Sequence, residues 1–392
     1  MTSLDVLGTS SGKPLDELLA GLRDLLEDAD FPTVKRWREA GGKVLGHFQV
    51  YCPEEIAHAA GLLPLKVRGA PIEARQAEAR FGSYLCSIIK TSLELALSKR
   101  IELDLFVTHP ICDAARHSCG VWARNFPELP CQILYFPHNT RSAYAEDYLA
   151  AEYRRIGGLI SEVTGRPLSD DALRESIALF NENRRLLREL YRIKRETPWR
   201  VSSVEAYVLT RVAAVMPREE HNALLERALP LIEARKGKAQ DRIRVVFEGG
   251  FCEQPPVDML AIIQDICYIV DDDLLIGFRW LTEDVPVEGD PIASLAHAYL
   301  ETSSYSPVQR DPAKPKEEML LRRIRESGAE AAIVSAAKMC EPGLEEQVTY
   351  SRALDGEGIP HLIMEFEEKT NVFEQMRMEV ETFAESLLFE FA

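Results

Sequence analysis

The chain has 392 residues, of which 46% are hydrophobic and 28% charged, a balance typical of folded globular proteins and not of disordered ones. Its 63 acidic and 46 basic residues give a net charge of −17, which excludes the broad cationic surface of a nucleic-acid binder but leaves room for a local basic pocket that takes a small anion. No apolar run approaches the roughly 18 residues of a membrane span, and the start lacks the basic-then-apolar plan of a signal peptide, so we expect a cytoplasmic protein with no membrane partner.

The first part of the chain predicts helices that alternate with short buried strands. Residues 1–45 carry leucines at helical spacing, and a short helix follows over 53–61, with Pro53 in its first turn and Gly61 as its stop. A longer helix is expected over 83–100, with Ser83 as the N-cap, and another over 111–126. Strands are expected over 62–67, 103–108 and 131–136. Residues 144–235 read as helical throughout.

A second alternating stretch begins near residue 242. Strands are expected over 242–250, 267–273, 331–337 and 359–366, and helices over 255–266, 314–327, 344–358 and 371–390. Strands that alternate with helices predict an α/β fold with parallel sheets covered on both faces. We therefore expect a helical N-terminal segment over 1–45, a first α/β domain over 46–143, a helical region over 144–240 and a second α/β domain over 241–392.

The eight cysteines are scattered and include no CxxC pair, so a metal site would have to be assembled from distant segments. Three of them, Cys86, Cys112 and Cys340, are expected at helix starts, and the last two also follow strands, where sites of α/β sheets form. A helix N-terminus lowers the pKa of a thiol and favours the thiolate that binds metal. These residues alone do not decide between iron and zinc, and any single one could be a small buried packing residue.

Three segments resemble the 2-hydroxyacyl-CoA dehydratase and benzoyl-CoA reductase family. YLCSIIK (84–90), LDLFVTHPICDAARHSCGVW (103–122) and AAIVSAAKMCEPGLEEQ (331–347) are similar to its three cysteine motifs, and GHFQVYCPEEIAHAAGLLPLKVRG (46–69) resembles its entry segment. The resemblance implies two flavodoxin-like domains and one [4Fe–4S] cluster held by Cys86, Cys112 and Cys340. Cys119 matches no ligand position of the family.

The resemblance also implies partners and a reaction. The segments 111–122 and 181–207 look more like the reductase branch, which implies reduction of an aromatic acyl-CoA, benzoyl-CoA, with a homologous cluster-binding subunit and ATP-hydrolysing electron-donor subunits. The chain has no GxxxxGK[ST] motif, so ATP would be bound by those partners. The alternatives are a subunit of a 2-hydroxyacyl-CoA dehydratase, an electron-relay subunit whose pair mate holds the substrate, and a zinc hydrolase.

Such a reduction needs a proton source beside a dry pocket. His109, at the end of the strand 103–108, and Glu54, at a helix start, are the candidates, although a turn histidine and an acid that favours the helix dipole are the plainer interpretations. Lys66 and Arg68 are candidates for CoA phosphates. The remaining cysteines are expected to pack (Cys119, Cys131 and Cys267), to line the cleft (Cys252) or to have no assigned role (Cys52).

Overall fold

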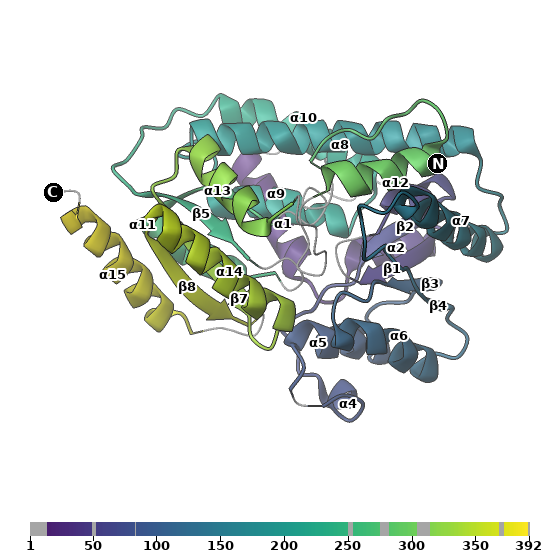
Figure 1. The fold of residues 1–392 in the computed structure, drawn as a ribbon. Helices are drawn as coiled ribbons and strands as arrows, with labels where there is room; N and C mark the ends of the chain where they lie inside the picture. The colour runs from purple at the N-terminus through teal and green to yellow at the C-terminus, as the bar shows by residue number, and fades with distance from the viewer. Residues whose placement is uncertain are drawn as a thin grey trace.

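A computed structural model describes residues 14–48, 52–82, 84–249, 254–274, 282–303, 314–367 and 372–390. It contains two four-stranded parallel sheets, with strand orders β2-β1-β3-β4 and β6-β5-β7-β8. Each sheet therefore has the order 2-1-3-4 when its strands are numbered along the chain, which is the beginning of the flavodoxin-like doubly wound order. The predicted α/β class is confirmed, and Figure 1 shows the two sheets side by side with helices around both.

The first sheet includes a strand that the sequence pattern did not predict. The strand β1 lies inside the sheet between β2 and β3, and five of its six residues are buried. It was missed because Gly46 and His47 interrupt an already short apolar run. The elements of this domain are β1 (Lys43–Phe48), α3 (Glu54–Ala59), β2 (Leu62–Lys66), α4 (Arg75–Glu78), α5 (Ser87–Leu97), β3 (Leu105–Thr108), α6 (Asp113–Asn125) and β4 (Cys131–Ile133).

The second sheet follows the predicted pattern closely. All seven residues of its central strand β7 are buried, as expected of a strand covered by helices on both faces. The elements are β5 (Arg244–Glu248), α11 (Val257–Ile266), β6 (Tyr268–Asp272), α13 (Lys316–Ser327), β7 (Ala331–Ala337), α14 (Glu341–Glu357), β8 (His361–Phe366) and α15 (Glu374–Glu390).

Helices precede the first sheet and connect the two domains. Residues 144–235 are helical with three interruptions, and the segment contains α7 (Ala145–Thr164), α8 (Asp170–Glu196), α9 (Ser203–Arg211), the 3-10 turn η1 (Val212–Ala214) and α10 (Arg218–Glu233). The N-terminal helices are α1 (Leu15–Glu27) and α2 (Pro32–Glu39). A further helix, α12 (Pro291–Thr302), was not predicted; it comes from the second half of the chain but packs against α7.

The helix α8 spans the molecule and is bonded to both domains (Figure 1). Near its middle, the guanidinium of Arg184 pairs with Glu55 of α3, and near its end the ammonium of Lys194 pairs with Asp272 of β6. All four side chains are almost completely buried. The hydroxyl of Tyr191 also donates to Asp272, at 2.6 Å. Because a buried ion pair tolerates little displacement, α8 fixes the two domains relative to each other.

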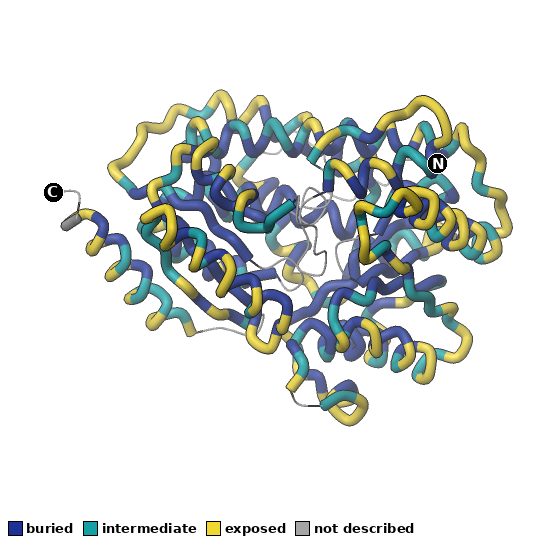
Figure 2. Tube along the Cα trace, in the orientation of Figure 1, coloured by how far each residue is buried: buried dark blue, intermediate teal, exposed yellow. Residues whose placement is uncertain are grey.

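Burial follows the layers of the fold. Figure 2 shows buried strands inside and exposed residues mainly on the outer turns of the helices. The largest buried cluster contains residues of both sheets, including Phe106 and Phe247. Within the described ranges, no helix is long and apolar enough to span a lipid bilayer.

Candidate functional site: three cysteines around one cavity

Cys86, Cys112 and Cys340 occupy the same kind of position in three different helices. Each is the N-cap residue, the last residue before the helix begins: Cys86 for α5, Cys112 for α6 and Cys340 for α14. The helix predicted from Ser83 therefore begins at Ser87 instead, and Ser83 lies outside the described residues. Because the first amides of a helix have no partners within it, each sulfur lies beside the positive end of a helix.

The two α/β domains place these helix starts at matching edges of their sheets. Cys112 follows β3 and Cys340 follows β7, and both strands lie third in the order of their own sheet. Between β7 and Cys340 the chain passes through Met339, whose φ of 62° is in the left-handed region that non-glycine residues rarely adopt. This turn sets the direction in which Cys340 leaves the sheet.

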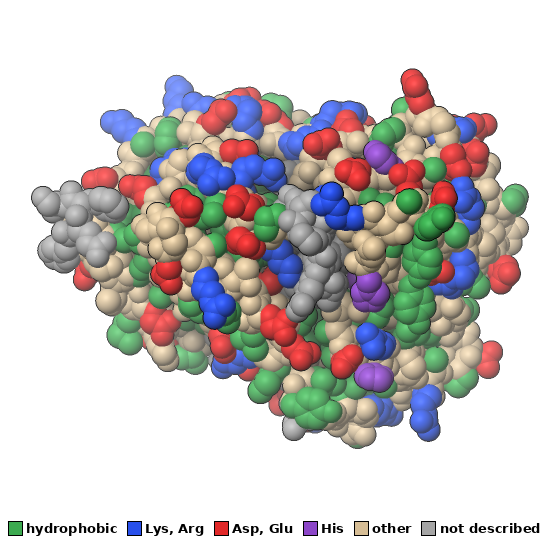
Figure 3. Space-filling view, in the orientation of Figure 1, with side chains coloured by type: hydrophobic (Ala, Val, Ile, Leu, Met, Phe, Trp, Pro, Cys, Tyr) green, Lys and Arg blue, Asp and Glu red, His purple; other side chains and the backbone are tan. Residues whose placement is uncertain are grey.

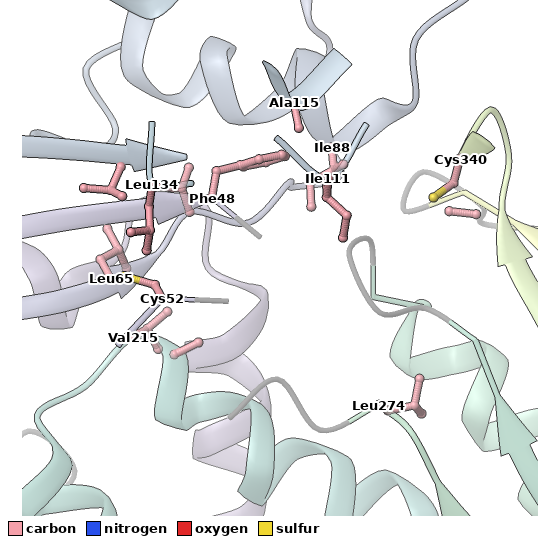
Figure 4. Close-up of a cluster of buried hydrophobic side chains, with 14 of the residues drawn as sticks. Phe48, Cys52, Leu65, Ile88, Ile111, Ala115, Leu134, Val215, Leu274 and Cys340 are labelled. Carbon is pink, nitrogen blue, oxygen red and sulfur yellow. The ribbon is translucent and has the colours of Figure 1, made fainter. Parts of the chain in front are cut away.

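All three cysteines line one cavity of about 970 Å³ between the domains. The first domain contributes Cys86, Cys112 and apolar residues such as Ile88 and Ile111, and the second contributes Cys340 and Leu344. In Figure 4 the sulfur of Cys340 lies on the side that faces Ile88 and Ile111 across the gap between the domains. The fold thus brings together three thiols that are widely separated in the sequence.

The surroundings of Cys112 act on its thiol in opposite directions. Burial raises the pKa of Cys112, hydrogen bonds from the backbone amides of Ala115 and Ala114 lower it, and the nearby Glu341 and Asp113 raise it. The net pKa of Cys112 lies above its usual value, so the expectation of a lowered pKa is wrong for the metal-free chain. The cause is that the loss of solvation on burial raises the pKa by more than the amides at the start of the helix lower it. The amide of Ala115 nevertheless donates to the Cys112 sulfur at 3.4 Å, an N-cap contact that favours negative charge on this sulfur.

The three thiols are soft donors, the kind of ligand that zinc and iron–sulfur clusters both use. Among the residues that the structure describes, no group of three or more His, Cys, Asp or Glu side chains is gathered closely enough to hold a metal ion. Instead, the thiols are distributed around a cavity. Gly343, in the first turn of α14, packs closely against Cys340, because an added Cβ would lie 3.3 Å from its sulfur. Three cysteines around one cavity are a donor set that an iron–sulfur cluster can use.

His109 lines a second cavity, of about 540 Å³, that shares Cys112, Glu341 and Pro342 with the first. Its side chain is buried, its Nδ1 lies 3.3 Å from the carbonyl oxygen of Leu134, and its ring packs edge-to-face on Phe136. Burial lowers the pKa of His109 to about 4, although the bond to Leu134 opposes this shift. Its imidazole is therefore neutral at pH 7, with the Nδ1 proton donated to Leu134, so its Nε2 carries no proton to donate at that pH and is only a weak base.

Glu54 lies elsewhere, and it lines neither of these cavities. Its carboxylate is 2.9 Å from His47 and 2.6 Å from Arg218. Burial alone would raise the pKa of Glu54, but the charge of Arg218 and the bond to His47 outweigh it and hold this pKa at about 2. A carboxylate that stays ionised in this way is a poor proton donor, which argues against the predicted catalytic role.

The basic residues expected at CoA phosphates are not at the surface. Lys66 and Arg68 are 1% and 5% exposed. The guanidinium of Arg68 donates to the backbone carbonyls of Asp28 and Gly69 and covers the ring of Phe31 at 4.6 Å. Arg68 therefore ties the N-terminal helices to the first sheet.

Of the remaining cysteines, Cys119 and Cys267 are buried, as expected of packing residues. Cys267 caps the end of α11 just before β6, not within the strand, and Cys131 begins β4 and is partly exposed. Cys52 is buried, and Cys252 lies outside the described residues. Met339 and Gly343 were not among the predicted site residues. The glycine beside Cys340 was a usable signal, whereas methionine gives no sign of a left-handed backbone.

Comparison with known proteins agrees with this arrangement. The family model described as "2-hydroxyglutaryl-CoA dehydratase, D-component" matches residues 49–387. A benzoyl-CoA reductase subunit of Thauera aromatica is 35% identical over 95% of this chain and 98% of its own length. The beta subunit of lactoyl-CoA dehydratase of Anaerotignum propionicum is 27% identical, over 95% and 99% of the two chains. The beta subunit of (R)-2-hydroxyglutaryl-CoA dehydratase of Acidaminococcus fermentans is 28% identical, over 90% and 94%.

These matches cover nearly all of the chain and nearly all of each relative, and the family model includes all three cavity cysteines. The chain belongs to the 2-hydroxyglutaryl-CoA dehydratase D-component family, which is the family that its cysteine motifs indicated.

Proposed function

We propose that this chain is the [4Fe–4S] subunit of an ATP-dependent benzoyl-CoA reductase, which adds two electrons and two protons to the aromatic ring of benzoyl-CoA and yields a cyclohexadiene-carbonyl-CoA. The observation that supports this proposal most directly is the placement of Cys86, Cys112 and Cys340 at three helix N-caps around one cavity.

In this proposal the three thiolates hold the cluster, and the cluster when bound supplies electrons at low potential. The chain's own residues define its surroundings. The N-termini of α5, α6 and α14 offset the negative charge of the thiolates, and the amide of Ala115 donates to the Cys112 sulfur. Apolar side chains such as Ile88, Ile111 and Leu344 limit access of water to the cavity, which a low-potential reduction requires.

The choice of reductase over dehydratase rests on sequence similarity. At nearly equal coverage, identity is 35% to the reductase relative and 27–28% to the two dehydratase relatives. The (R)-2-hydroxyacyl-CoA dehydratase alternative, in which the complex removes water to give an enoyl-CoA, remains the competing function. Incubation of the complete enzyme with both substrate classes under anaerobic conditions separates them, since a diene thioester supports the proposal and an enoyl-CoA alone overturns it.

The chain is expected to work only with partners. Three exposed side chains at the mouth of the cysteine cavity are hydrophobic: Tyr84, Met339 and Val348 are 73%, 60% and 52% exposed. Such a rim is suited to contact with another subunit. Because the sequence has no P-loop motif, ATP hydrolysis is assigned to separate electron-donor subunits, and the complex also includes the homologous cluster-binding subunit. The isolated chain should show no reductase or ATPase activity.

Cysteine substitution tests the cluster directly. Cys86→Ser, Cys112→Ser and Cys340→Ser should each lose much of the iron and the brown absorbance of protein prepared without oxygen. Cys119→Ser is the matched control, because Cys119 is buried inside α6 and lines neither cavity. If Cys119→Ser bleaches the protein while Cys112→Ser keeps its iron, the ligand assignment is wrong. Zinc in place of iron in the native protein would instead support the hydrolase alternative.

An electron-relay role is the remaining alternative, because a homologous pair mate could hold the substrate. Anaerobic binding of benzoyl-CoA to each isolated subunit distinguishes the two arrangements. Binding to this chain supports a catalytic role, and binding only to the pair mate assigns this chain to electron transfer.

A further inference from the structure

A third cavity, of about 520 Å³, lies at the opposite edge of the second domain from the cysteines. Its walls come from the segment after α8, the segment after α10 and the end of α11, and they include Arg242, just before β5, and Tyr268, the first residue of β6. It therefore lies at the amino ends of the strands, whereas Cys340 follows the carboxyl end of β7. A seven-residue strand such as β7 is roughly 23 Å long, so this cavity is separate from the site of the cysteines.

The lining of this cavity is strongly basic in a strongly acidic chain. It includes five cationic side chains and two carboxylates, although the whole chain has a net charge of −17. On the face shown in Figure 3, by contrast, acidic and basic side chains are interspersed. The cations are Arg200, Arg235, Lys236, Lys238 and Arg242.

Neither carboxylate is available to neutralise these cations as a group. Glu205 is 2.8 Å from Arg235, and Asp265 is 3.2 Å from Arg377 of α15. Arg235 is thus already paired. The other four cations, Arg200, Lys236, Lys238 and Arg242, have no ion pair with any carboxylate in the described part of the chain. Four uncompensated cations repel one another, and an anion that binds among them relieves this repulsion.

Several contacts hold the cavity in shape. The guanidinium of Arg242 donates to the backbone carbonyl of Gln264, and its central carbon lies 5.6 Å from the centre of the Tyr268 ring. Gly237 lies so close to Trp199 that an added Cβ would be 2.9 Å from its Cδ1 and its carbonyl oxygen. The Nε of Arg200 is buried and has no hydrogen-bond partner within the described ranges.

We propose that this cavity binds a small molecule that carries a diphosphate group. Arginine and lysine are the side chains that recognise phosphate oxygens, and four cations suit the charge of a diphosphate better than that of a single carboxylate. The volume is in the range of small-ligand sites. Because the cavity is remote from the cysteines, the bound molecule does not take part in the cluster's chemistry. Two sources share this chemistry: inorganic pyrophosphate and a nucleoside diphosphate.

Calorimetric titration of the full-length chain, prepared without oxygen, tests the proposal with pyrophosphate and with ADP. The test variant is Lys236→Ala/Lys238→Ala, because both lysines are exposed and lie outside helices and strands, so the variant should keep its fold. The control variant is Arg124→Ala/Arg322→Ala, which removes the same charge from exposed positions on α6 and α13. The native chain and the control should bind, the lysine variant should bind about tenfold more weakly or not at all, and high salt should weaken binding.

Equal affinity for both probes would show that the diphosphate group alone accounts for binding. Tighter binding of ADP would show that the nucleoside also contacts the cavity. Either result supports the proposed site. The proposal is overturned if neither probe binds the native chain, or if the lysine variant and the control bind equally well. It is also overturned if an acidic glutamate-rich peptide binds while both diphosphates fail, since the cavity would then dock an acidic segment of another protein.

Discussion

The guanidinium of Arg218, at the first position of α10, lies 2.6 Å from the carboxylate of Glu54, at the first position of α3. Arg218 is buried and Glu54 is mostly buried, with 6% and 12% of their side chains exposed, and the pair joins the helical region to the first sheet. Arg218 also donates to Asn183 of α8 at 3.1 Å and lies over the ring of Phe180. The ion pair with Arg218 therefore gives Glu54 a structural role at the start of α3.

Replacement of Glu54 tests this explanation. Glu54→Gln should lower the free energy of unfolding by roughly 3 kcal/mol or more, because it leaves the buried charge of Arg218 without its counterion. Protein that remains folded should keep its iron, since Glu54 does not line the cysteine cavity. Denaturant unfolding and iron analysis provide the two measurements.

The matched control for this change is Glu219→Gln. Glu219 also pairs with a neighbour, His58 at 3.0 Å, but its side chain is 57% exposed, so its replacement should change stability by about 0–1 kcal/mol. If instead Glu54→Gln unfolds like the native chain but abolishes turnover of the assembled enzyme, Glu54 is catalytic after all.

A fall in pH should destabilise the fold through two side chains near Arg218, His221 and Glu54. Burial and the charge of Arg218 lower the pKa of His221 to about 3, so the folded state holds it neutral while the unfolded chain protonates it below about pH 6.5. Its contribution to stability is therefore complete above pH 6.5 and decreases as the pH falls towards 3. Glu54, whose pKa in the fold is about 2, adds a further loss below about pH 4.5.

His221→Gln isolates the first of these groups. Between pH 6 and 5 the native chain should lose stability more steeply than the variant, by at most about 1.4 kcal/mol per pH unit, which is the limit for one proton. Chemical denaturation at several pH values measures both slopes. Identical slopes would show that His221 is not held neutral by the fold.

Local patterns explain how much of this molecule was predictable. The strand 331–337 and the Cys-Glu-Pro sequence after it are continuous in the chain, so both β7 and the helix start at Cys340 followed from the sequence. The helix α12 was missed because its contacts are with α7, more than a hundred residues earlier. The ion pair of Glu54 could not be foreseen for the same reason: Arg218 is distant in sequence, and no local signal shows that it neutralises an acid at the start of α3, so the catalytic role of Glu54 stays a prediction.

The buried pair of Lys194 and Asp272 tests how α8 is fastened to the second domain. Lys194→Met should destabilise the protein by about 3 kcal/mol or more, because Asp272 stays buried without its cation. The double variant Lys194→Met/Asp272→Asn should recover a large part of this loss, since no charge is then left unpaired and Asn can still accept from Tyr191. Denaturant unfolding of the two single variants and the double variant gives the coupling. Additive losses would contradict a buried ion pair.

A substitution at Gly343, in the first turn of α14, should affect cluster binding and helix stability in different directions. An alanine here should favour the helix by up to about 1 kcal/mol, but its Cβ would lie 3.3 Å from the Cys340 sulfur and crowd the space beside it. We therefore expect Gly343→Ala to leave the metal-free chain as stable as the native one or more stable, while the iron content falls. Gly356→Ala is the control in the same helix, because nothing lies within 4 Å of its added Cβ; it should raise stability and leave iron unchanged. Full iron content in Gly343→Ala would contradict this prediction and show that the cluster does not approach the position of the added Cβ.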